Sequence, residues 1–142
     1  MKILITGGFG YIGSRLVVNL NNEGHQIIIG SRNLTYQPNW ITRSKIVFTD
    51  WNNSLALEEI CNGVDVVIHT AGMNAQDCFL DPDKALEFNG IATARLVSSA
   101  ISVGVKRFIY LSSAHVYSSP LVGNISESTE PKNIHPYCTS QI

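Results

Sequence analysis

Short apolar runs recur along the chain, separated by longer segments in which apolar residues return every three or four positions. Runs that are apolar at successive positions are typical of strands covered on both faces of a parallel sheet. They occupy residues 3–5, 27–29, 46–48 and 108–111, and residues 66–68 form the centre of a further strand expected at 64–69. The segments between them predict helices at residues 12–20, 55–60 and 81–103. In the first helix, Ile12, Leu16 and Leu20 form a stripe that we expect to face the sheet.

Glycine and proline positions agree with these boundaries. Gly24 and Gly104 follow helical segments as C-terminal caps, and Pro82 suits a helix start. Residues 33–44 are polar, contain Pro38 and predict a loop or an irregular helix, and a polar loop runs from residue 114 to Tyr137. Strands that alternate with helices at this spacing predict an α/β fold with a parallel sheet in the order 3-2-1-4-5.

Composition narrows the class of protein. With 142 residues and 44% hydrophobic positions, residues 1–142 are expected to form a single domain. The net charge of −1, with scattered Lys and Arg, gives no nucleic-acid footprint. Three cysteines without a CxxC pair and four histidines without an HxxxH pair predict no metal site. Without a leader or an apolar run of the ~20 residues that a membrane helix needs, we expect a soluble, cytoplasmic protein.

A glycine-rich stretch lies between the first strand and the first helix, at residues 6–13. There one glycine permits a tight turn, one lets backbone approach a pyrophosphate, and one lets the helix pack closely on the strand. Free N–H groups at the helix start then attract phosphate. The alternative is an ordinary glycine-rich turn. The predicted pyrophosphate-binding residues are Gly7, Gly8, Phe9, Gly10, Tyr11, Ile12 and Gly13.

The end of the second strand bears on which dinucleotide binds. An NAD site usually has a carboxylate here that binds the ribose hydroxyls, whereas this chain has Ser31 and Arg32. A hydroxyl and a guanidinium suit a 2′-phosphate, so we favour NADP(H), with NAD(H) as the alternative. Both residues could equally form a solvated turn. Asp50 is a candidate partner for the adenine amino group or simply a strand-end carboxylate, and His69 is expected to be buried and hydrogen-bonded.

The chain resembles the extended short-chain dehydrogenase/reductases, the NAD(P)-dependent epimerase/dehydratase family that acts largely on nucleotide sugars. The resemblance rests on residues 6–13, Asp50-Trp51, residues 69–72, Asn89-Gly90, residues 112–117 and Tyr137. It implies a three-layer Rossmann-type fold and hydride transfer at the nicotinamide C4. It also implies that Tyr137 is the acid/base, that Ser113 hydrogen-bonds the reacting oxygen, and that a nucleotide sugar and a second copy are partners. The further cofactor-binding positions that it implies are Trp51, Thr70, Ala71, Gly72 and Asn89.

Two departures from the family pattern bear on activity. Gln141 stands where the family has lysine, four residues after Tyr137. A phenol with a pKa near 10 needs about 4 kcal/mol of phenolate stabilisation to lose its proton about three pH units lower, and a neutral amide supplies no charge for it. The chain also ends before the family's substrate-binding lobe. We therefore expect a cofactor-binding part of an enzyme with impaired catalysis, or alternatively a non-catalytic dinucleotide-binding module or an inactive fragment.

Overall fold

The computed structural model describes residues 1–34, 38–41, 43–118 and 120–142, which form two compact units. The first unit contains residues 1–71 and 94–111, and the second contains residues 72–93 and 112–142.

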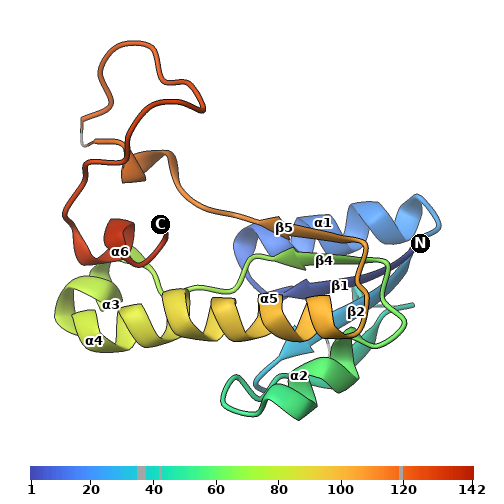
Figure 1. The fold of residues 1–142 in the computed structure, drawn as a ribbon. Coiled ribbons are helices and arrows are strands. Elements are labelled where there is room, and N and C mark those ends of the chain that lie inside the picture. Colours follow the sequence, from blue (N-terminus) through green and yellow to red (C-terminus); the bar gives the residue numbers. More distant parts are fainter. Residues whose placement is uncertain (35–37, 42, 119) are drawn as a thin grey trace. The chain divides into compact units, whose positions relative to one another are not determined.

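A five-stranded parallel sheet forms the centre of the first unit (Figure 1). Its order, β3-β2-β1-β4-β5, confirms the order predicted from the apolar runs. In the register, Leu4 pairs with Ile28 on one side and with Val67 on the other. Because all the strands are parallel, their carboxyl ends meet at one edge of the sheet. The strands are β1 (Lys2–Thr6), β2 (Gln26–Ser31), β3 (Lys45–Phe48), β4 (Val66–His69) and β5 (Arg107–Tyr110).

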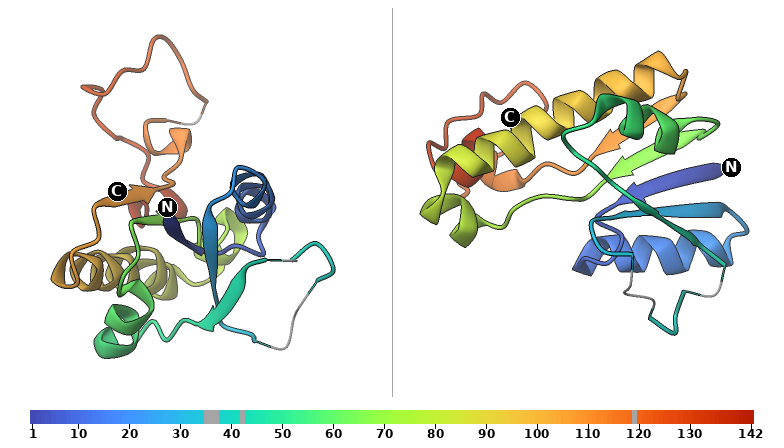
Figure 2. Two further views of the ribbon diagram at one scale, coloured as in Figure 1. Left: turned by 90° about the vertical axis from the view of Figure 1, so that its right-hand side faces the viewer. Right: turned by 90° about the horizontal axis from the view of Figure 1, so that it is seen from below.

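Helices cover both faces of this sheet, which explains why its strands are continuously apolar (Figure 2). Helix α1 (Tyr11–Asn22) packs on the face that carries Ile3 and Ile5. Helices α2 (Ser54–Cys61) and α5 (Ala92–Ser102) pack on the opposite face, which carries Leu4. In α1 the fully buried positions are Gly13 and Val17, while Ile12 is half exposed. The predicted stripe was therefore wrong at Ile12, because the first turn of α1 must bring a glycine rather than a side chain against the strand.

The second unit is made of short helical elements. They are α3 (Ala75–Leu80), α4 (Pro82–Ala85), the π-helix η1 (Leu86–Ile91), the first residues of α5, the 3-10 turn η2 (Ala114–Val116) and α6 (Pro136–Thr139). The helix expected at residues 81–103 is present from residue 82 to 102, but its second turn is a π-helix. Helix α3 was not expected from the sequence, because Phe79 and Leu80 are exposed and give it no buried apolar stripe.

Within the described residues, no helix is both long and apolar enough to cross a membrane. The same residues contain no group of three or more His, Cys, Asp or Glu side chains that could hold a metal ion.

Candidate functional site

The loop after β1 turns sharply into α1. Gly7 has a φ of +71°, in the left-handed region that glycine adopts without strain, and its carbonyl accepts a hydrogen bond from Gly10 N at 2.9 Å. Gly10 is the N-cap of α1, and no side chain caps the first turn. The loop therefore presents backbone at the positive end of a twelve-residue helix, an arrangement that favours an anion.

Close backbone packing explains the other glycines of this loop. A Cβ on Gly13 would lie 2.2 Å from the carbonyl oxygen of Gly7, so any side chain there would push α1 off the strand. A Cβ on Gly7 would lie 2.7 Å from the nitrogen of Ala71, so the residues that follow β4 lie directly against the loop. A Cβ on Gly8 would lie 2.8 Å from the side chain of Ile29. The spacing predicted a tight turn and a close approach of the helix to the strand. Gly7 makes the turn, and Gly13 permits the close approach.

The ends of β1 and β4 are tied together beside this loop. Thr70 donates to the carbonyl oxygen of Thr6 from both its hydroxyl, at 2.7 Å, and its backbone N–H, at 3.1 Å. The Thr6 hydroxyl hydrogen-bonds Nδ1 of His69 at 2.5 Å. His69 is 2% exposed and lies among the rings of Trp51, Phe108 and Tyr110. The buried, hydrogen-bonded histidine that was expected is therefore confirmed, and burial lowers its pKa from 6.5 to about 4.

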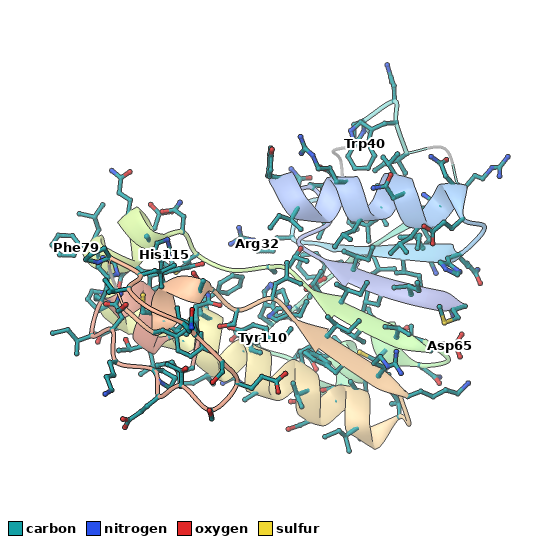
Figure 3. The ribbon with its side chains drawn as sticks, turned by 90° about the horizontal axis from the view of Figure 1, so that it is seen from above. Arg32, Trp40, Asp65, Phe79, Tyr110 and His115 are labelled. Carbon is teal, nitrogen blue, oxygen red and sulfur yellow. The ribbon has the colours of Figure 1, made fainter. Side chains whose placement is uncertain are left out.

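The turn after β2 uses one of its two candidate residues internally. The Ser31 hydroxyl donates to the carbonyl oxygen of Asn33 at 2.8 Å and accepts from the Asn33 N–H at 3.0 Å. Arg32 is exposed beside it (Figure 3). A third residue, Gly30, was not singled out from the sequence, yet its Cβ would lie 2.8 Å from the hydroxyl of the buried Thr49 on the neighbouring segment. Of Gly30, Ser31 and Arg32, only Arg32 carries a charge that could attract a phosphate.

Asp50 and Trp51 follow β3 and belong to the same unit. The Asp50 carboxylate accepts from the Asn52 N–H at 3.1 Å, which is a local turn contact. Trp51 packs against the core, and its carbonyl oxygen accepts from Arg95 at 3.4 Å. These contacts give both residues structural roles in addition to the binding roles expected for them.

The second unit holds both candidate catalytic residues, on elements that contact one another. Ser113 is the N-cap of η2, and its hydroxyl oxygen accepts from the His115 N–H at 3.2 Å. Tyr137 lies in the first turn of α6, which packs against η2. Accepting a hydrogen bond leaves the Ser113 hydroxyl proton to donate elsewhere. The unit thus brings a hydroxyl donor and a phenol, 24 positions apart in the sequence, onto neighbouring turns.

Asn89 is the buried polar centre of the second unit. Its Oδ1 accepts from the Met73 N–H at 2.8 Å, and its Nδ2 donates to the Ser140 hydroxyl at 2.9 Å and to the Cys78 sulfur at 3.5 Å. Ser140 in turn donates to the carbonyl oxygen of Tyr137 at 2.9 Å. Asn89 lies in the π-helix, a local distortion that often marks functional sites. Its amide therefore organises the residues around Tyr137.

Gln141 is buried in the second unit rather than projecting into water. It is 7% exposed, and its backbone carbonyl oxygen accepts a hydrogen bond from the Ser112 hydroxyl at 3.2 Å. A Cβ on Gly72 would lie 3.5 Å from the Nε2 of Gln141, so the amide lies near Gly72. A neutral amide therefore occupies the position at which the family resemblance implies a charged amine.

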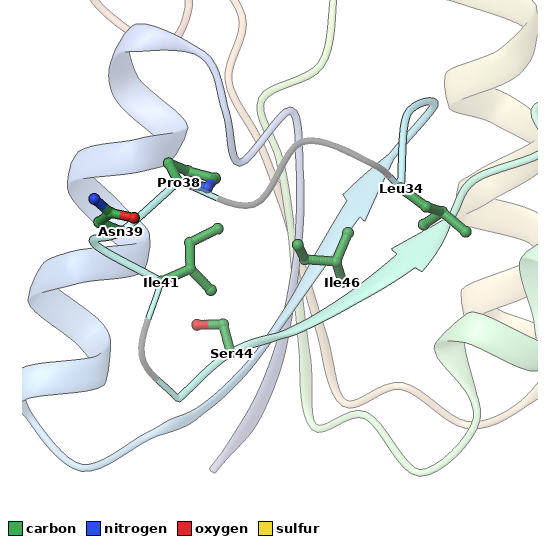
Figure 4. Close-up of a pocket in the computed structure, with 6 residues that line it drawn as sticks. All are labelled: Leu34, Pro38, Asn39, Ile41, Ser44 and Ile46. Carbon is green, nitrogen blue, oxygen red and sulfur yellow. The ribbon is translucent and has the colours of Figure 1, made fainter.

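Two cavities of the first unit lie away from the glycine loop. A cavity of about 450 Å³ beside β3 is lined by Leu34, Pro38, Asn39, Ile41, Ser44 and Ile46 (Figure 4). Ser44 immediately precedes β3 and accepts from Asn21 in the last turn of α1, so this cavity reaches the amino end of the strand. The second, of about 350 Å³, lies on the outer side of α1 between Arg15 and Trp40. Neither contains a residue predicted to bind cofactor.

Comparison with known proteins gives a consistent result. A model of the NAD dependent epimerase/dehydratase family matches residues 3–142. The chain is 34% identical to a UDP-glucose 4-epimerase of Neisseria meningitidis serogroup C over 152 residues, which take in 99% of this chain and 45% of that protein.

Solved structures agree with this match. A UDP-glucose 4-epimerase from Stenotrophomonas maltophila, with bound NAD and formylated UDP-arabinopyranose, has a TM-score of 0.88 and 23% identity, which supports the fold alone. MoeE5 in complex with UDP-glucose and NAD has a TM-score of 0.85 and 29% identity. Each covers 99% of this chain, whereas this chain covers 45% and 46% of them. The chain thus spans less than half the length of these relatives.

Proposed function

The chain belongs to the NAD dependent epimerase/dehydratase family, and from this premise we propose that it is the dinucleotide-binding part of a nucleotide-sugar epimerase, dehydratase or reductase. The observation that carries the proposal is the glycine loop, in which backbone contacts exclude a Cβ at Gly7 and Gly13 and the Ile29 side chain crowds one at Gly8. The bound ligands of the structural relatives, NAD with a UDP-sugar, support the same two ligand classes here.

The residues of the first unit fit a dinucleotide. The backbone from Gly7 to Gly13 would hold the pyrophosphate, because no side chain caps α1 and the helix dipole favours negative charge there. Thr70 and Ala71 lie against the loop and would limit how deeply the ligand enters. Asp50 and Trp51 would bound the adenine. When bound, this cofactor accepts or returns a hydride at the nicotinamide C4.

Isothermal titration calorimetry with NAD(H) and NADP(H) tests this binding. We expect saturable binding of at least one coenzyme to the folded chain. A glycine-loop variant such as Gly13→Ala should lose this binding. Gly90→Ala is its matched control, because the added Cβ would meet only the flexible end of the Leu86 side chain, at 3.4 Å. A folded protein that binds neither coenzyme at millimolar concentration would refute the proposed function.

We propose that Arg32 gives the site a preference for NADP(H). The support is the absence of a carboxylate at the end of β2 together with an exposed guanidinium there. Ser31 is engaged within its own turn, so Arg32 carries the preference. A charge-assisted hydrogen bond contributes about 1.5–3 kcal/mol, which corresponds to roughly 10- to 150-fold in affinity.

Titration of Arg32→Ala should remove the preference for NADPH over NADH and leave NADH binding nearly unchanged. Arg107→Ala is the control, because Arg107 begins β5 and so lies at the amino edge of the sheet. If the unmodified chain binds NADH at least as tightly as NADPH, the preference is for NAD(H) and the role of Arg32 is lost.

Ser113 and Tyr137 are the proposed catalytic residues. Tyr137 would exchange a proton with a sugar hydroxyl, and the Ser113 hydroxyl would donate a hydrogen bond to the same oxygen. Gln141 supplies no positive charge to stabilise a phenolate, so we propose that turnover is slow. The second candidate function is a non-catalytic dinucleotide-binding module, which the neutral, buried Gln141 favours.

Turnover of UDP-glucose with NAD(P) in the unmodified chain, Gln141→Lys and Gln141→Met distinguishes these functions. Lysine should raise turnover and shift the rising limb of the pH–rate profile to lower pH, whereas methionine, of similar length but uncharged, should not. Tight coenzyme binding without turnover in all three proteins would favour the module.

The same proposal extends to association and location. We propose a homodimer in which the second unit takes part, supported by its exposed apolar side chains Phe79, Leu80 and Leu86. A monomer in light scattering at micromolar concentration would contradict it.

We place the protein in the cytoplasm because its three cysteines are free thiols, as is usual in a reducing compartment.

A further inference from the structure

The segment just before α6 is fastened to the turn that carries Ser113. The backbone N–H groups of Lys132 and Asn133 both donate to the carbonyl oxygen of Val116, each at 3.1 Å. Val116 is buried at the end of η2. The chain leaves η2 after this residue, and these contacts bring it back to the same point at residue 132.

Asn133 connects the two sides of this junction through its side chain. Its Nδ2 donates to the carbonyl oxygen of His115 at 2.9 Å, and its Oδ1 accepts from the His135 N–H at 3.0 Å. Both ends of one amide are therefore used, one toward η2 and one toward the start of α6. A side chain that can both donate and accept is required for this arrangement, and alanine or aspartate cannot reproduce it.

His135 continues the connection to the candidate acid/base residue. Its Nδ1 accepts from the Tyr137 N–H at 3.1 Å, which makes the imidazole the N-cap of α6. For Nδ1 to accept, the ring hydrogen must lie on Nε2. The ring also stacks on Phe79 of α3, with centroids 6.0 Å apart and planes at 23°. The imidazole therefore contacts α3 as well as capping α6.

We propose that Asn133 and His135 are positioning residues that hold Tyr137 in a defined place relative to Ser113. The route runs from the Ser113 hydroxyl through the His115 backbone, the Asn133 amide and the His135 ring to the Tyr137 backbone, in hydrogen bonds of 2.9–3.2 Å. Neither residue need touch substrate. The inference rests on the proposed function only in that the positioned groups are those assigned to catalysis.

Amide hydrogen exchange by NMR tests the connection without relying on activity. In Asn133→Ala the amides of both His115 and Tyr137 should exchange about tenfold faster, although Asn133 bonds to neither N–H. His135→Ala should expose the Tyr137 amide, and His135→Asn should restore its protection because asparagine is a good N-cap. Thr129→Ala is the matched control, because it removes a side-chain contact within the adjoining loop and should leave both amides unchanged.

Kinetics in the Gln141→Lys background provide the second measurement. Asn133→Ala should lower kcat about tenfold with little change in KM or in coenzyme affinity, and His135→Asn should keep most of the rate. If Asn133→Ala speeds exchange at His135 alone, the positioning role is refuted whether or not the protein turns over substrate. If exchange changes as expected but no variant turns over substrate, the catalytic assignment of Ser113 and Tyr137 is refuted and the positioning role stands.

Discussion

His69 should make the first unit sensitive to acid. Its imidazole is 2% exposed, and burial lowers its pKa from 6.5 to about 4. The neutral ring is therefore favoured in the folded state and gains a proton more readily in the unfolded chain. The resulting stability is fully present above pH 6.5 and is lost as the pH falls from 6.5 to about 4.

The size of this loss follows from the pKa difference. Between 6.5 and about 4, at about 1.4 kcal/mol per pH unit, the free energy of unfolding should fall by about 3 kcal/mol. About 1 kcal/mol of this should already be lost at pH 5.5. Since small domains are stable by about 5–15 kcal/mol, a loss of this size is readily measured.

Urea unfolding at several pH values, followed by tryptophan fluorescence, measures the effect. Trp51 lies 5.6 Å from the His69 ring between centroids, and Trp40 belongs to the same unit, so the signal reports on the unit that holds His69. His69→Asn removes the titrating group, and the exposed His115, replaced by asparagine, is the control.

The informative quantity is the difference in the free energy of unfolding between the unmodified chain and each variant at each pH. His69→Asn should be less stable at pH 7.5 but should lose less stability toward pH 4.5, whereas His115→Asn should follow the unmodified chain. Asp65, whose pKa is lowered chiefly by the Lys2 N–H, loses its contribution as the pH falls through its lowered pKa in all three proteins, and so it cancels. Parallel pH curves for the unmodified chain and His69→Asn would refute the reasoning.

Three further outcomes are expected. Gly13→Ala should abolish coenzyme binding in calorimetry and lower the melting temperature, because its methyl would lie 2.2 Å from backbone, whereas Gly90→Ala should do neither. Asn53→Ala should cost about 1 kcal/mol in urea unfolding, since it removes the side chain that caps α2. Cys61, whose pKa burial raises to about 11, should not react with a thiol reagent at pH 8 until urea is added; rapid labelling of the folded chain would contradict its burial.

Local patterns in the sequence predicted most of the strands and helices of the first unit. The runs at residues 3–5 and 27–29 are apolar at every position because α1 covers one face of the sheet while α2 and α5 cover the other. Such patterns are readable without a structure, since burial on two faces requires apolar residues at every position of a strand. The predicted stripe in α1 was wrong at Ile12, where contact with the loop backbone rather than periodicity selects Gly13.

The elements of the second unit were harder to predict from the sequence. Helix α3 exposes its large apolar residues, so no periodic signal marks it. The π-helix that contains Asn89 looked like ordinary helix, because the i→i+5 pattern leaves no trace in hydrophobic spacing.

The sequence by itself determined the strand order, the glycine loop and the likeness to the epimerase/dehydratase family, because these depend on residue types at short, regular spacings. Only the tertiary structure decided which polar groups meet: Thr6 with His69, Asn89 with Ser140, and Asn133 between His115 and His135. Hydrogen bonds require partners within about 3 Å and in the right direction. Chain segments tens of residues apart satisfy that condition only after folding has brought them together.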